Sequence, residues 1–165
     1  GRPVAPGEDW TEPERPTTYD ALLTAFDEHS AALVAALEAA DPAEPAWSWS
    51  DEQTVGFTFR RQAHEALIHR LDAELTAGEV TPLDPELAAD GVDEALAVMF
   101  GGTPPWGAFT PLPDGVPQLV RVNLTDRDDS VWVQLGHFSG TDPESDTRHE
   151  ALEDIAVVGD PGGEP

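Results

Sequence analysis

Apolar side chains return every three or four residues in three stretches of the sequence, at 17–40, 50–76 and 84–101. This spacing places them on one side of an α-helix, so each stretch is predicted to form an amphipathic helix. Pro42 follows the first stretch and forbids its continuation, and Gly78 follows the second as a typical helix-ending residue.

The residues at the start of each stretch match the preferences of helix caps. Thr17 or Thr18 can cap the first helix, and Asp84, which a proline follows directly, can cap the third. Ser50 with Gln53 three residues later has the form of a capping box, which predicts that the second helix begins there.

The hydrophobic pattern changes from helical to alternating after Gly101. Residues 119–124 and 131–135 alternate between apolar and polar positions across an acidic turn, which predicts a β-hairpin. The polar stretch 137–150 is predicted to be a loop, and 154–158 to be a third strand.

These elements predict an α+β fold, with a helical bundle portion at 1–101 and the start of a β-containing domain at 102–165. Three helices are one short of a closed four-helix bundle, and a small sheet with little cover is marginal in water. We therefore expect both parts to be incomplete and the helices to expose an apolar face.

Charge and composition exclude several kinds of function. The 165 residues include 33 acidic and 8 basic side chains, a net charge of -25, and no cysteine. Binding to nucleic acid or to an anionic membrane is therefore not expected, and disulfides, cysteine zinc sites and cysteine nucleophiles are excluded. The sequence has no apolar run of the about 20 residues that span a membrane, and no signal segment, so a cytoplasmic protein is expected.

Candidate chemistry lies in the second helix. Glu65 and His69 are four residues apart, which separates them by about 40° of rotation and about 6 Å of rise. A carboxylate and an imidazole on one face can occupy two positions on a divalent metal. Asp72, one turn further, can orient His69 through its second ring nitrogen. His64 lies about 140° around the helix from His69, which rules out the zinc-protease motif HExxH.

A plainer interpretation of the same face is that it is solvated. Arg61 and Glu65 would then form an ordinary ion pair four residues apart, worth a few tenths of a kcal/mol. His29 lies among the apolar residues of the first helix and is expected to be a buried core histidine.

The segments TVGFTFRRQAHEALIHRLDAEL (54–75) and PLDPELAADGVDEAL (82–96) resemble the mycothiol-dependent maleylpyruvate isomerase family of actinobacteria. The resemblance implies a DinB-like four-helix bundle with a divalent metal, usually zinc. It places one metal ligand on Glu65 and another on His69. The family's remaining histidine ligand comes from an amino-terminal helix for which we find no matching segment.

The resemblance implies a thiol enzyme whose cosubstrate is mycothiol. Because the chain has no cysteine of its own, the thiol would have to come from such a cosubstrate. The thiolate would add to a small-molecule electrophile, either reversibly, giving cis/trans isomerisation, or permanently, giving an S-conjugate. The alternative is a non-catalytic acidic binding module or nucleic-acid mimic, which a charge of -25 would also suit.

Overall fold

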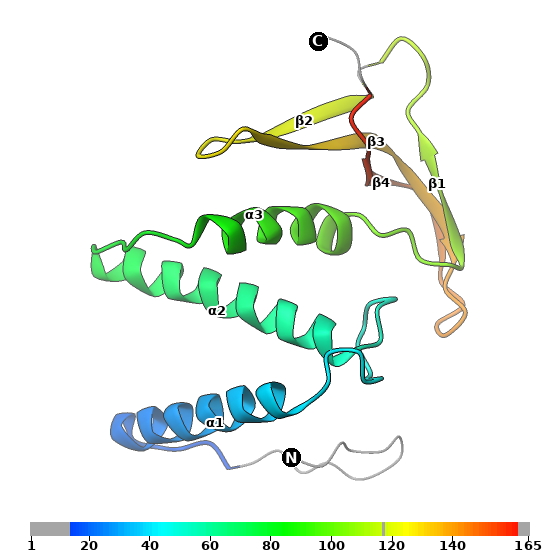
Figure 1. Cartoon of the computed structure of the whole chain (residues 1–165). Coiled ribbons are helices and arrows are strands. Elements are labelled where there is room, and N and C mark those ends of the chain that lie inside the picture. The colour runs from blue at the N-terminus through cyan, green and yellow to red at the C-terminus, as the bar shows by residue number, and fades with distance from the viewer. Residues whose placement is uncertain (1–13, 117, 162–165) are drawn as a thin grey trace.

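The computed structural model describes residues 14–116 and 118–161, in which helices precede an antiparallel sheet (Figure 1). The helices are α1 (Tyr19–Ala39), α2 (Val55–Ala77) and α3 (Pro85–Glu94), which the π-helical segment η1 (Ala95–Phe100) continues. The strands are β1 (Gly107–Pro111), β2 (Leu119–Leu124), β3 (Asp129–Thr141) and β4 (Arg148–Val158). In Figure 1, α3 lies between α2 and the sheet, and α1 lies beyond α2. The predicted α+β class is confirmed.

The ends of the helices follow their local sequence. The Thr18 side chain accepts a hydrogen bond from the first turn of α1, as one of the two predicted caps. The Asp84 side chain accepts two backbone hydrogen bonds at the start of α3, as predicted. Gly78 ends α2 with φ of 79°, a left-handed conformation that glycine adopts without steric cost. None of the described helices combines the length and the apolar character that a membrane crossing requires.

The predicted start of the second helix is wrong. The Gln53 side-chain amide donates to the carbonyl oxygens of Ser48 and Ser50, both at 2.6 Å, and so closes a loop ahead of the helix. Because Gln53 is held in this loop, Thr54 becomes the cap, and its side chain accepts a hydrogen bond from the amide of Phe57 at 3.1 Å.

The sheet is organised around β3. β4 pairs with residues 132–141 of β3, β2 with residues 129–134 and β1 with residues 136–140, all antiparallel. Since a strand has only two edges, β4 occupies one of them and β1 and β2 share the other, end to end. The predicted hairpin is present as β2 and β3.

The predicted loop at 137–150 is wrong. β3 continues to Thr141 and β4 begins at Arg148, leaving a short turn between two long strands. The segment has a polar composition, which is why the sequence predicts a loop. In the strand, however, exposed polar side chains alternate with buried positions such as Phe138, which is 8% exposed. β1 was not predicted. It packs closely on β3 because position 136 is glycine, where a Cβ atom would lie 2.4 Å from the ring of Phe109.

The first helix packs little against the rest of the described chain. None of its residues is buried, and Phe26 is 67% exposed, so the expected exposed apolar face is present on α1. The expectation that His29 is a core residue is wrong, because the side of α1 that carries it is exposed.

Candidate functional site

The most buried side chain of the described residues is a carboxylate. Glu94, at the end of α3, is 1% exposed, and His64, on the facing side of α2, is 3% exposed. The Oε2 atom of Glu94 lies 2.6 Å from Nδ1 of His64 and accepts a hydrogen bond from Nη1 of Arg61 at 2.8 Å. Burying a carboxylate is costly unless polar or charged partners compensate for the lost water. The contacts of Glu94 with Arg61 and His64 provide such partners, and they join α3 to α2.

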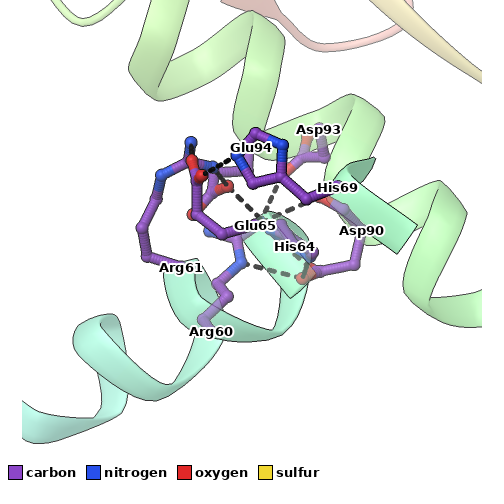
Figure 2. A network of polar contacts seen from close by, with 8 residues as sticks. All are labelled: Arg60, Arg61, His64, Glu65, His69, Asp90, Asp93 and Glu94. Carbon is purple, nitrogen blue, oxygen red and sulfur yellow. Dashed lines mark hydrogen bonds and ion pairs between the residues drawn. The ribbon is translucent and has the colours of Figure 1, made fainter. Parts of the chain in front are cut away.

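A second layer of charged groups lies outside this pair (Figure 2). Arg60 forms a two-pronged contact with Asp90, at 2.9 Å and 3.0 Å, and also reaches Asp93 at 3.5 Å. The hydrogen bond from Arg60 lowers the pKa of Asp90 below its ordinary value. Nε2 of His64 lies 2.9 Å from Asp90, but it is not aligned for a hydrogen bond.

The three residues that the sequence singled out lie together on α2. Nε2 of His69 is 3.2 Å from Oε2 of Glu65, and Nδ1 of His69 is 3.3 Å from Oδ2 of Asp72. The His69 side chain is 71% exposed, so both of its contacts are open to solvent and small molecules. The two ring nitrogens therefore face two different carboxylates, one on each neighbouring turn.

The Glu65 and His69 pair fits two adjacent positions around a zinc ion. Zinc bonds of about 2.0–2.1 Å in a tetrahedron put neighbouring ligand atoms about 3.3 Å apart. The observed separation of 3.2 Å between Oε2 and Nε2 is close to this edge. Within residues 14–116 and 118–161, however, no group of three or more histidine or acidic side chains is arranged to hold a metal. The described chain thus offers a two-ligand edge and not a complete cage.

Arg61 connects the candidate ligands to the buried pair. Its Nη2 atom contacts Oε1 of Glu65, while its Nη1 atom holds Glu94. The ion pair that the solvated-face interpretation assumed is present, but the Arg61 side chain is only 20% exposed. The face is therefore solvated at His69 and becomes more enclosed toward Arg61, about two turns earlier.

Sequence reasoning did not find Glu94 or Asp90. A usable signal was their four-residue spacing on α3, which matches that of Arg60 and His64 on α2. Opposite charges at matching spacing on two consecutive helices favour pairing between them. The pairing depends on which faces meet, and spacing alone does not fix that.

An open cleft of about 960 Å³ lies between α3 and the sheet. It is bordered by two arginines and six acidic residues, with the ring of Trp132 among the apolar lining. The Arg121 guanidinium lies 5.6 Å from the centre of the Trp132 ring. Asp90 and Asp93 also border the cleft, so the polar network and the cleft share one side of α3.

The lowered pKa of Asp90 predicts a loss of stability in acid. A carboxyl whose folded pKa lies below its unfolded value stabilises the fold above the unfolded pKa, about 3.9, and loses this effect as pH falls through the folded pKa. We expect Asp90→Asn to have a lower free energy of unfolding than wild type at pH 7, and this difference to become smaller below about pH 4. Urea unfolding at several pH values measures it, with Asp126→Asn, in the exposed β2–β3 turn, as the control. A difference that is constant with pH would contradict the Arg60–Asp90 pairing.

Residues 1–74 match the family model described as "Mycothiol maleylpyruvate isomerase N-terminal domain". The match confirms the family resemblance over that range, which contains Glu65, His69 and Asp72. Glu94 and the whole sheet lie outside it. No curated protein and no solved structure matches the chain.

Proposed function

We propose that the chain acts as a divalent-metal-dependent thiol enzyme, with zinc as the metal and mycothiol as the cosubstrate. The observation that carries the proposal is the 3.2 Å separation of Oε2 of Glu65 and Nε2 of His69 inside the range that matches the family. Zinc bound at this edge would lower the pKa of a thiol ligand and supply a thiolate at neutral pH.

The roles of the chain's own residues follow from their contacts. Glu65 and His69 supply one oxygen and one nitrogen ligand. With the Nδ1–H tautomer of His69, that ring nitrogen would donate a hydrogen bond to Asp72 across 3.3 Å, and the lone pair of Nε2 would be available to the metal on the side of Glu65. The thiol comes from the cosubstrate because the sequence has no cysteine. The exposure of His69 leaves room for a thiol and a substrate beside it.

The charge of the chain favours S-transfer to an uncharged electrophile over isomerisation of a dicarboxylate. Maleylpyruvate carries two carboxylates, and a chain of net charge -25 repels such a dianion at long range. The cleft beside α3 does not reverse this field, because six acidic residues border it against two arginines.

An activity comparison tests this proposal. With zinc and mycothiol present, we expect the full chain to convert an uncharged conjugated enone faster than maleylpyruvate, with both conversions followed by the absorbance of the substrate. S-transfer consumes mycothiol, which a colorimetric thiol assay detects, whereas isomerisation by reversible addition regenerates it. The two conversion rates should become more equal at high salt, since salt screens the repulsion. Faster conversion of maleylpyruvate without thiol loss at low salt would support the isomerase instead, and no zinc-dependent conversion of either substrate would favour the acidic module.

A further inference from the structure

One guanidinium bridges a buried carboxylate on α3 and a partly exposed carboxylate on α2 (Figure 2). Nη1 of Arg61 donates to Oε2 of Glu94 at 2.8 Å, and Nη2 contacts Oε1 of Glu65. The Glu94 side chain is 1% exposed, that of Arg61 20% and that of Glu65 36%. The bridge thus runs from the interior of the helix pair toward solvent, and it ends on the proposed metal ligand.

We propose that Glu94 and Arg61 act as positioning residues that fix the Glu65 carboxylate for metal binding, an inference that rests on the proposed function. Arg61 occupies Oε1 of Glu65 and leaves Oε2 facing Nε2 of His69 at 3.2 Å. A free glutamate at the surface samples many rotamers, and binding a metal would cost that freedom. Holding the carboxylate in advance removes part of this cost.

Glu94 is needed because Arg61 alone would be a weak anchor. An exposed arginine four residues before a glutamate contributes little, since both side chains remain free to move. Here the arginine is held at its other end by a buried carboxylate, which His64 also contacts at 2.6 Å through the same oxygen. The guanidinium group is planar and rigid, so fixing its Nη1 atom on Glu94 also restricts the position of its Nη2 atom. Because Nη2 contacts Glu65, this restricts the Glu65 carboxylate as well.

The test compares two neighbouring arginines in the full chain. Arg61 and Arg60 both pair with α3, but Arg60 pairs with Asp90 and Asp93, and no hydrogen bond or ion pair joins it to Glu65 or Glu94. We expect Arg61→Met to weaken zinc affinity about 10- to 100-fold, the range found when residues supporting a metal ligand are lost. Arg60→Met should change it less than about twofold. Competition with a chromophoric chelator measures the affinity, and circular dichroism confirms that each variant is folded.

A double-mutant cycle separates positioning from a general structural effect. If Glu94 acts on the metal site through Arg61, Glu94→Gln weakens zinc affinity in the wild-type background and has no further effect in Arg61→Met. Additive losses would overturn the proposal. Where Glu94→Gln does not fold, the Arg61→Met and Arg60→Met comparison decides, and equal affinities of those two variants would overturn it.

The outcome also distinguishes this inference from the proposed function. Loss of zinc in His69→Ala, together with wild-type affinity in Arg61→Met, would overturn the positioning role and leave the metal site standing. Wild-type affinity in His69→Ala would overturn the metal site at Glu65 and His69, and the positioning role with it.

Discussion

Glu94→Ala is expected to destabilise the chain by about 3–5 kcal/mol, the usual cost of removing one partner from a buried ion pair. Glu94 is the largest fully buried side chain of the described residues, and its carboxylate faces both Arg61 and His64. Truncation leaves these two polar groups buried without their carboxylate. Since whole domains are stable by only about 5–15 kcal/mol, such a loss is a large fraction of the total stability.

Chemical denaturation followed by circular dichroism measures this loss. Asp93→Ala is the matched control, because Asp93 precedes Glu94 on the same helix, is half exposed and pairs with Arg60 at 3.5 Å. Exposed ion pairs contribute about 0–1 kcal/mol, so the control should remain close to wild type. Equal losses of stability in the two variants would contradict the prediction, because they would show that the buried ion pair of Glu94 contributes no more than the exposed one of Asp93.

His69→Ala is expected to abolish stoichiometric zinc binding, and Glu65→Ala to reduce it strongly. Each substitution removes one of the two ligand atoms that the described chain brings to the proposed edge. His29→Ala is the control, because His29 is an exposed histidine on another helix. Equilibrium dialysis with metal analysis measures the stoichiometry. Equal zinc content in the three variants would place the metal elsewhere or show that there is none.

Asp72 tests the same site from outside the ligand pair. Asp72→Asn keeps the shape of the side chain but weakens the acceptor that faces Nδ1 of His69. We expect a loss of zinc affinity of about 10- to 100-fold without a change in fold, as for other partners of ligating histidines.

The helices could be predicted because their signals are local. Threonine and aspartate caps, proline stops and the glycine at position 78 act within one or two turns, and the structure places them as the sequence indicated, apart from the start of α2. At the start of α2, the side chain of Gln53 donates to the preceding loop and does not cap the helix. The sequence pattern, a serine followed three residues later by a glutamine, is the same in a capping box and in this loop.

The sheet and the buried network depend on contacts between distant residues. The end of β3 looked like a loop because its polar residues are paired with β4, and such pairing leaves no local signature. Glu65, His69 and Asp72 could be placed on one face because helix geometry fixes that face. Glu94 could not, because its burial depends on how α3 packs against α2, and that packing is a tertiary property.

The central claim, a metal held by Glu65 and His69 that receives an external thiol, is tested most directly by the absorption spectrum of the cobalt-substituted protein. Adding mycothiol to the full chain with bound Co²⁺ should produce a new band from a sulfur-to-cobalt bond, which a chain without cysteine cannot supply itself. His69→Ala treated in the same way should show no such band. A cobalt spectrum that mycothiol leaves unchanged in the wild-type protein would contradict the account.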